Sequence, residues 1–172
     1  IVQFDYAPDY KYYTSDISRV FPANGRFTPR QRELYTIYLR LYQALMSSIK
    51  PGVPITDIAS AAGAKMSAII DAFTFTDPAI KTAATTFAVQ YQTGKPRNSL
   101  GHGLGMEVHD VTVRRQAFQP GELFTIEPPI SIPDERLAMR IEDVILITEN
   151  GFENLSSFVP IEPDAIEQLM KK

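Results

Sequence analysis

Apolar residues recur at helical spacing after residue 28. They mark one face of a helix at intervals of three and four residues: Leu34, Ile37, Tyr38, Leu41, Leu45 and Ile49. Thr28 followed by Gln31 has the spacing of a capping box, and Pro29 suits the first helical position. The pattern therefore predicts a helix that starts after Thr28 and is stopped by Lys50-Pro51-Gly52.

Three further helices are expected along the chain. An Ala-rich stretch predicts one helix from Thr56 or Asp57 to Phe73, and another runs from Pro78 to about Tyr91, with Asp77 as its N-cap. Residues 164–172 can form a short final helix. Residues 94–105 are rich in Gly, Pro and Asn, which predicts a loop after the helical region.

Two hairpins complete the pattern. Residues 1–6 and 12–20 are rich in β-branched and aromatic residues, and Ala7-Pro8-Asp9 supplies turn chemistry between them. Residues 122–131 and 137–148 alternate in the manner of strands, with Pro133-Asp134-Glu135 as their turn. Since no repeat or low-complexity linker divides the chain, one α+β domain is the expected architecture.

Composition narrows the classes of function. With 172 residues, 44% of them hydrophobic, the chain can build a single core. A net charge of −3 gives no basic footprint for nucleic acid, and no apolar run approaches the roughly 18 residues of a membrane span. The absence of Cys excludes disulfides, thiolate catalysis and Cys-type metal sites. The chain opens on Ile1 within an apolar stretch, so we expect it to be part of a longer protein; its compartment is left open.

Carboxylates inside apolar strands are the informative anomaly. Asp5, Glu127 and Glu142 each lie in such a strand, where any one of them taken alone fits the solvent face of a half-exposed sheet. Hairpins symmetric about Tyr10-Lys11 and Asp134-Glu135 would place Asp5 opposite Asp16 and Glu127 opposite Glu142. Directly opposed like charges are destabilising, so two such pairs predict positive charge between them.

Two divalent cations would neutralise these four carboxylates. Two-metal hydrolytic sites hold their ions about 3.5–4 Å apart, a distance that opposed or bridging carboxylates match. The only imidazoles are His102 and His109, both near the end of a Gly-rich stretch, and mixed oxygen and imidazole ligands favour Mn, Co, Fe or Zn over calcium. The glycines around His102 are not followed by a phosphate-loop motif, which argues against a phosphate cradle.

Arg140 is a further candidate. It lies two residues before Glu142, hence on the same face of a strand. It can fix a carboxylate ligand by a bidentate bond, bind a carboxylate of the substrate, or be an ordinary surface arginine.

The ordered set Asp5, Asp16, His102, Glu127 and Glu142 resembles the five metal ligands of the pita-bread (M24-type) metallopeptidases. The supporting strings are Ser15-Asp16-Ile17-Ser18-Arg19, Gly101-His102-Gly103-Leu104-Gly105, Val108-His109-Asp110, Thr125-Ile126-Glu127-Pro128 and Arg140-Ile141-Glu142-Asp143. The last string is similar to the Xaa-Pro aminopeptidase and prolidase branch. Methionine aminopeptidases, which typically carry a Gln-Phe-Glu type sequence there, are the alternative within the family.

The resemblance implies a pita-bread fold, with a curved antiparallel sheet and helices packed on one face. It also implies two divalent ions (Mn, Co or Zn), bridged by Asp16 and Glu142, with Asp5 on one ion and His102 and Glu127 on the other. A hydroxide between the ions would attack the Xaa-Pro bond at the N-terminus of short peptides with proline in second position.

The resemblance also assigns catalytic roles. Glu127 would pass a proton towards the leaving nitrogen, and His109 would stabilise charge near the scissile carbonyl. Arg140 would complete the catalytic set.

Three departures from the family pattern concern the substrate site rather than the metal site. Family members usually carry helices, strands and a further His upstream of the Asp5 strand. Pro128-Pro129-Ile130-Ser131 stands where the pattern usually reads Pro-Gly-x-Tyr, and only 15 residues separate Glu127 from Glu142. We therefore expect residues 1–172 to be a partial, C-terminal catalytic domain that lacks its N-terminal portion.

Two expectations beyond the peptidase reaction remain. A non-catalytic pita-bread binding module is the alternative from another class of function; such relatives usually replace several ligands, whereas all five stand here. A strand edge left exposed at the N-terminal side would allow a homodimer.

Overall fold

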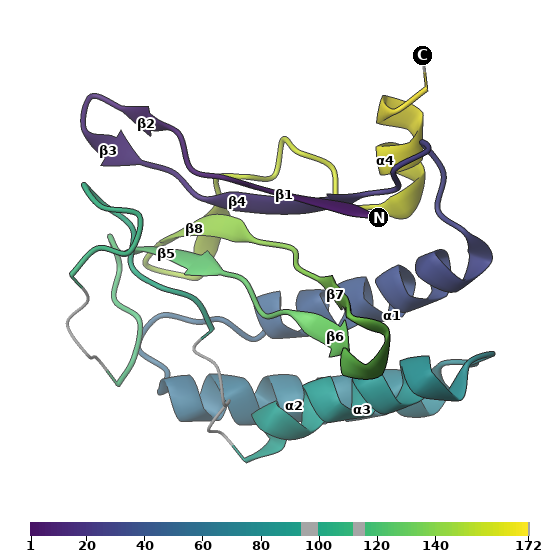
Figure 1. The fold of residues 1–172 in the computed structure, drawn as a ribbon. Coiled ribbons are helices and arrows are strands. Elements are labelled where there is room, and N and C mark those ends of the chain that lie inside the picture. Colours follow the sequence, from purple (N-terminus) through teal and green to yellow (C-terminus); the bar gives the residue numbers. More distant parts are fainter. Residues whose placement is uncertain (94–99, 112–115, 172) are drawn as a thin grey trace.

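A computed structural model describes residues 1–93, 100–111 and 116–171. Its strands are β1 (Val2–Tyr6), β2 (Asp9–Tyr10), β3 (Tyr13–Thr14), β4 (Ile17–Phe21), β5 (Leu123–Ile126), β6 (Ile130–Ile132), β7 (Leu137–Met139), β8 (Asp143–Ile147) and β9 (Phe152–Asn154). Its helices are α1 (Pro29–Met46), α2 (Ile55–Ala72), α3 (Pro78–Gln92) and α4 (Pro163–Leu169), with a 3₁₀ turn at Pro133–Glu135. Every strand pairing among them is antiparallel, which makes the architecture α+β as predicted (Figure 1).

The first predicted helix is confirmed as α1. The Thr28 side chain accepts a hydrogen bond from the Gln31 backbone N–H, and the Gln31 side chain accepts one from the Thr28 N–H, so the capping box forms. All six residues of the predicted apolar face are buried. The helix ends at Met46, a few residues before the predicted Lys50-Pro51-Gly52 stop.

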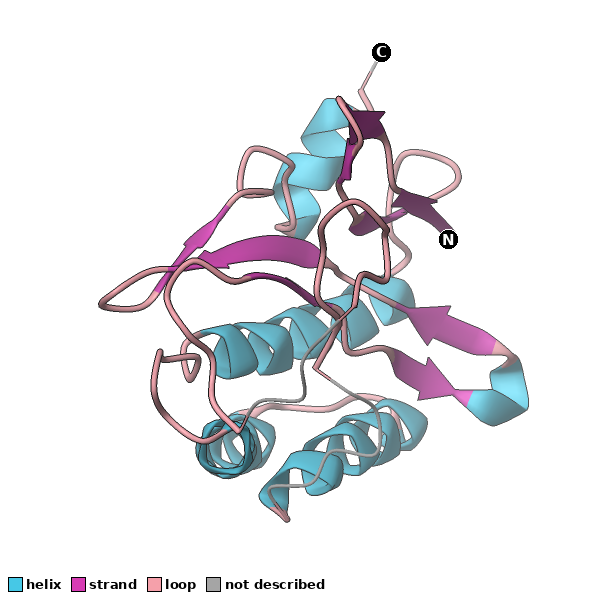
Figure 2. Ribbon diagram, turned by 90° about the vertical axis from the view of Figure 1, so that its left-hand side faces the viewer, coloured by secondary structure: helices cyan, strands magenta, loops and turns pink. Residues whose placement is uncertain are grey.

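The other predicted helices are also present. Asp77 caps α3 by accepting a hydrogen bond from the Ala79 N–H, as expected. Figures 1 and 2 show α1 lying between the strands and the α2–α3 pair, so its two faces are both covered. None of the helices in the described part of the chain combines the length and apolarity that a membrane crossing requires. Of the predicted loop 94–105, residues 94–99 lie outside the described residues, and residues 100–105 form no named strand.

The predicted register of the first hairpin is wrong by two residues. Asp5 pairs with Ser18, not with Asp16, because the chain turns at Lys11 and Tyr12, both with positive φ. Gly, Asn and Asp usually occupy such left-handed positions, so these two residues gave no turn signal. The hairpin is also broken into two short ladders, β1–β4 and β2–β3, and Asp16 lies in the gap between β3 and β4.

The predicted register of the second hairpin is confirmed. Ile126 pairs with Asp143 and Ile130 with Met139, so one register, centred on Asp134-Glu135, runs through both β5–β8 and β6–β7. Each predicted long strand is nevertheless split in two. The splits fall at residues 127–129 and 140–142, which carry Glu127 and Glu142 out of regular strand and place them opposite each other.

The two hairpins are joined where these gaps occur. An isolated bridge pairs Ser18 with Glu142, and the Glu142 N–H donates to the Ser18 carbonyl at 3.1 Å. Next to it, the buried Arg19 guanidinium forms an ion pair with Asp143 at 2.6 Å. β4 is thereby fixed against the start of β8, and the five residues expected to bind metal face a common space.

Candidate metal centre

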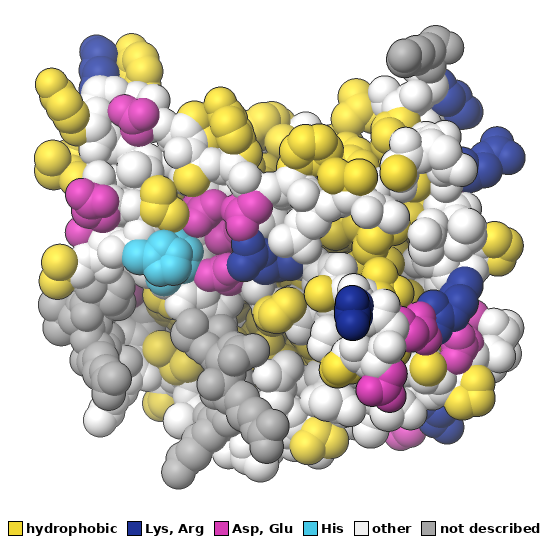
Figure 3. Space-filling view, viewed as in Figure 1, with side chains coloured by type: hydrophobic (Ala, Val, Ile, Leu, Met, Phe, Trp, Pro, Cys, Tyr) yellow, Lys and Arg dark blue, Asp and Glu magenta, His cyan; other side chains and the backbone are white. Residues whose placement is uncertain are grey.

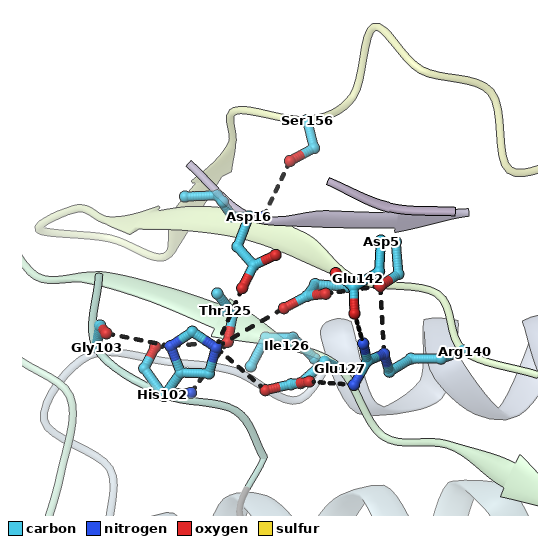
Figure 4. A network of polar contacts seen from close by, with 12 residues as sticks. Asp5, Asp16, His102, Gly103, Thr125, Ile126, Glu127, Arg140, Glu142 and Ser156 are labelled. Carbon is cyan, nitrogen blue, oxygen red and sulfur yellow. Dashed lines mark hydrogen bonds and ion pairs between the residues drawn. The ribbon is translucent and has the colours of Figure 1, made fainter. Parts of the chain in front are cut away.

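The residues expected to bind metal converge from five separate segments. Figure 4 shows Asp5, Asp16, His102, Glu127 and Glu142 pointing towards one another. Their ligand atoms lie within 4.8 Å of one another in overlapping groups: His102, Glu127 and Glu142 form one, and Asp5, Asp16 and Glu142 another. In Figure 3, acidic, basic and imidazole side chains gather at one place on the visible face of the molecule. Glu142 belongs to both groups and so connects them.

A close approach of two backbones places His102. Residues 100–104 run antiparallel to β5: the Thr125 N–H donates to the His102 carbonyl at 2.8 Å, and the Glu127 N–H to the Leu100 carbonyl at 2.9 Å. A Cβ at Gly101 would lie 1.8 Å from the Thr125 carbonyl oxygen, so only glycine permits this contact. The glycine therefore brings the imidazole beside Glu127 through backbone geometry rather than phosphate binding.

The orientation of the His102 ring leaves one nitrogen for the centre. Nδ1 lies 3.2 Å from the Gly103 carbonyl oxygen, as for an N–H donor. Nε2 is then the lone-pair nitrogen and lies 3.4 Å from Asp16, 3.3 Å from Glu127 and 3.9 Å from a Glu142 oxygen. Within the described part of the chain this buried nitrogen has no hydrogen-bond partner.

Hydrogen bonds hold Glu142 at its backbone carbonyl and at one of its two carboxylate oxygens. Its Oε2 accepts a hydrogen bond from the Ser18 hydroxyl at 2.8 Å, and its carbonyl accepts one from Arg19 at 2.6 Å. Its Oε1 is buried and has no hydrogen-bond partner among the described residues. Burial raises the pKa of Glu142 to about 7, a shift that the Ser18 hydrogen bond opposes and the charges of Glu127 and Asp16 increase.

Asp16 and Asp5 differ in exposure. Asp16 is buried, and its Oδ1 finds no hydrogen-bond partner in the described structure. Burial, and then the neighbouring charge of Asp5, raises the pKa of the Asp16 carboxyl. Asp5 lies on exposed β1 and forms an ion pair with Arg140. The wrong register therefore did not separate the two acids, because Asp16 reaches the centre from the gap between β3 and β4.

Arg140 joins the carboxylates to one another. Its guanidinium donates to Glu127 Oε2 at 3.0 Å, to the Ser18 hydroxyl at 3.2 Å, and to Asp5. Of the three roles considered for Arg140, these contacts favour the fixing of carboxylate ligands.

His109 lies beside the centre rather than within it. Its exposed ring stacks on His102, with centroids 4.0 Å apart and planes 18° from parallel. One of its nitrogens also falls within 4.8 Å of ligand atoms of Asp16 and His102, which gives a third possible group. Stacking on the inner imidazole is compatible with contact to a substrate entering from solvent.

Three residues of the site had no assigned role in the sequence. Ser18, Arg19 and Asp143 lie within strings that were quoted for their neighbours, yet all three are buried. Ser18 and Arg19 donate hydrogen bonds to Glu142, and Asp143 accepts one from Arg19. An available signal was the placement of Arg and Asp inside apolar strands, since buried charges are retained chiefly when they are paired.

The residues present fit divalent cations. Three buried atoms, Asp16 Oδ1, His102 Nε2 and Glu142 Oε1, have no hydrogen-bond partner among the described residues and point into the space among the five side chains. Buried polar atoms are normally satisfied, and carboxylate oxygens with an imidazole nitrogen are a donor set for transition-metal ions.

Comparison with known proteins places this centre in a family. A model of metallopeptidase family M24 matches residues 1–149. A Xaa-Pro aminopeptidase of Escherichia coli (strain K12) is 34% identical over 184 residues, which cover 99% of this chain and 41% of that protein. Xaa-Pro aminopeptidase 3 of Mus musculus is 35% identical over 175 residues, covering 93% and 33%.

Solved structures of aminopeptidase P are similar to this chain over nearly all of its length. An Escherichia coli aminopeptidase P variant in complex with substrate superposes with a TM-score of 0.74 at 32% identity, covering 98% of this chain and 40% of that one. Zn-substituted aminopeptidase P of E. coli in complex with product gives a TM-score of 0.70 at 33% identity, covering 94% and 39%. The chain thus spans between 33% and 41% of the length of these relatives. The predicted pita-bread fold is confirmed, and the chain belongs to metallopeptidase family M24.

Proposed function

We propose that residues 1–172 form a catalytic metallopeptidase domain that binds two divalent ions of the Mn, Co or Zn class. Asp16 and Glu142 would be shared between the ions, Asp5 would bind one, and His102 and Glu127 the other. The observation that carries the proposal is that three buried ligand atoms share one space and have no hydrogen-bond partner in the part of the chain that the structure describes. Glu142 supports the sharing, because it belongs to both the His102 group and the Asp5 group.

The proposed reaction is hydrolysis of the Xaa-Pro bond at the N-terminus of short peptides. Its substrate class follows from the names of the relatives. Bound divalent ions act as Lewis acids that polarise a carbonyl and lower the pKa of water. Glu127, oriented by Arg140, would transfer a proton towards the leaving proline nitrogen, and exposed His109 would donate to the developing oxyanion.

Peptide hydrolysis under added metal tests this function. The chain would be freed of metal with a chelator, supplied with Mn²⁺, Co²⁺ or Zn²⁺, and assayed with Ala-Pro-Ala, Met-Ala-Ala and Ala-Ala-Ala. Release of Ala from Ala-Pro-Ala alone is the expected result. Cleavage of Met-Ala-Ala instead would identify a methionine aminopeptidase. Metal binding without cleavage of any peptide would contradict the assigned activity for residues 1–172.

β1 supports one further element of the proposal. Its side chains are exposed, and in the described structure it pairs only with β4. Such an edge can pair with another chain, so we include a homodimer, which light scattering would detect as twice the 19.3 kDa mass of the chain.

A further inference from the structure

The hydroxyl of Tyr38 lies between the backbones of Pro128 and Ile141, where a continued antiparallel ladder would have a direct hydrogen bond. The Ile147 N–H donates to the Glu122 carbonyl at 2.9 Å. Hydrogen-bonded pairs recur at every second residue of an antiparallel ladder. Continued in the same register, the ladder brings Ile141 opposite Pro128 as such a pair.

Instead of a direct bond, a phenol spans this gap. The Ile141 N–H donates to the Tyr38 hydroxyl at 2.8 Å, and that hydroxyl donates to the Pro128 carbonyl at 2.7 Å. Proline has no N–H, so Pro128 cannot supply the second bond of the pair. The inserted hydroxyl thus replaces the ladder at the position where both strands are interrupted.

The inserted hydroxyl lies next to two of the five carboxylate and imidazole residues. Pro128 follows Glu127, and Ile141 precedes Glu142. Tyr42, one helical turn along α1, lies 2.8 Å from Asp143 Oδ2 and 3.3 Å from the Ile126 carbonyl, on the other side of the same two acids. One face of α1 therefore contacts the residues on both sides of Glu127 and Glu142, three of them at the backbone and Asp143 at its side chain.

We propose that Tyr38 is a positioning residue for the metal centre, whose hydroxyl sets the separation of the Glu127 and Glu142 carboxylates. The inference rests on the proposed function, since it assigns the separation to metal binding. Tyr38 is fully buried and touches neither carboxylate directly, so it acts through the backbone. Without the hydroxyl, Ile141 and Pro128 would either approach each other or remain unpaired, and both results displace the acids.

Tyr35 supplies a matched control on the same helix. It is as buried as Tyr38, and its hydroxyl donates to the Ile161 carbonyl at 2.9 Å, away from the five residues. Tyr35→Phe and Tyr38→Phe each remove one buried phenol oxygen. Both substitutions are expected to lower the stability of the chelator-treated, metal-free protein, whereas only Tyr38→Phe should change metal binding.

Calorimetric titration of the chelator-treated chain with MnCl₂ provides the test. We expect Tyr38→Phe to weaken binding at the His102, Glu127 and Glu142 group about 10–100-fold, as loss of a supporting hydrogen bond typically does, and Tyr35→Phe to match the wild type. Equal affinity of Tyr38→Phe and the wild type, or equal weakening by both variants, would overturn the positioning role while leaving the metal centre intact. Absence of Mn²⁺ binding by the wild type would overturn both.

Hydrogen exchange of the wild type tests the same bond if Tyr38→Phe does not fold. The Ile141 amide lies outside every named strand, yet its bond to Tyr38 should slow its exchange to that of the β8 ladder amides. Exchange as fast as that of an exposed turn amide would contradict the inserted hydroxyl.

Discussion

The Glu142 side chain is buried although it can carry a negative charge. It is 1% exposed, its neighbours include the carboxylates of Asp16 and Glu127, and one of its oxygens has no partner in the described structure. A buried carboxylate is unfavourable unless opposite charge or hydrogen bonds compensate it. The Ser18 hydroxyl compensates one oxygen, and we assign the other to metal.

Glu142→Gln tests this assignment because it removes the charge and keeps the shape. We expect Mn²⁺ binding to fall below one equivalent and peptide hydrolysis to fall about 10³-fold, since the proposed centre shares this carboxylate between both ions. In the presence of chelator at pH 8, above the Glu142 pKa of about 7, the same variant should melt about 2–4 °C higher than the wild type, because one buried negative charge is gone. Exposed Glu149→Gln is the control and should change neither value. Unaltered Mn²⁺ binding by Glu142→Gln would refute the shared carboxylate.

Arg140 acts through the shape of its guanidinium. It contacts Asp5, Glu127 and Ser18 together, which a single ammonium group on a flexible stem cannot reproduce. We expect Arg140→Lys to lower kcat/KM for Ala-Pro-Ala tenfold or more while the chain still binds Mn²⁺. Exposed Arg26→Lys serves as the control. Full activity of Arg140→Lys would show that charge alone suffices.

At the scale of elements, the position of the 100–104 segment against β5 determines where His102 lies. The segment is held by backbone hydrogen bonds, and Gly101 permits the contact because it has no Cβ. The imidazole is therefore placed by a glycine one residue away rather than by side-chain packing.

Gly101→Ala should displace this segment. The added Cβ would meet backbone at 1.8 Å, so the segment must move and carry His102 with it. We expect a titration to show that Mn²⁺ affinity falls at least tenfold. Circular dichroism should show that the chelator-treated protein unfolds at a lower urea concentration than the wild type. Gly151→Ala is the matched control, because a Cβ there meets nothing within 4 Å. Equal behaviour of the two variants would mean that the close approach does not position His102.

The elements also show how far a single sequence can be interpreted. The helix caps at Thr28 and Asp77 were predictable because capping depends on local residue type. The β5–β8 register was predictable because Pro133-Asp134-Glu135 signals its turn, whereas the turn at Lys11 and Tyr12 carries no such signal.

The candidate site was only partly predictable. Its four carboxylates were predicted from their places in two hairpins, and the resemblance to a family selected His102 as the fifth member of the set. The contact of the Tyr38 hydroxyl with the two backbones was not predicted, because an aromatic residue on a helical face first indicates core packing.

At the scale of the whole molecule, metal binding and folding should be coupled. The five residues come from segments between Asp5 and Glu142, so ions bound among them would link most of the chain. The metal-free protein keeps several carboxylates close together with only Arg140 among them in the described structure. Ligand that binds only the folded state stabilises it by RT ln(1 + [L]/Kd).

Thermal unfolding measures this coupling. At Mn²⁺ one hundred times above its Kd, the stabilisation is about 2.7 kcal/mol, which corresponds to a rise in Tm of roughly 5–10 °C for a chain of this size. Chelator should reverse the rise. Mg²⁺ at the same concentration serves as a control, because it prefers all-oxygen sites. A Tm that is indifferent to both Mn²⁺ and chelator would speak against the coupling.

We expect a pair of cations to occupy the space among five side chains: Asp5, Asp16, His102, Glu127 and Glu142. Equilibrium dialysis of the chelator-treated chain against saturating Mn²⁺, followed by elemental analysis, counts those cations directly. The expected result for the wild type is two Mn²⁺ per chain. One Mn²⁺ or fewer per chain at saturation would contradict the pair.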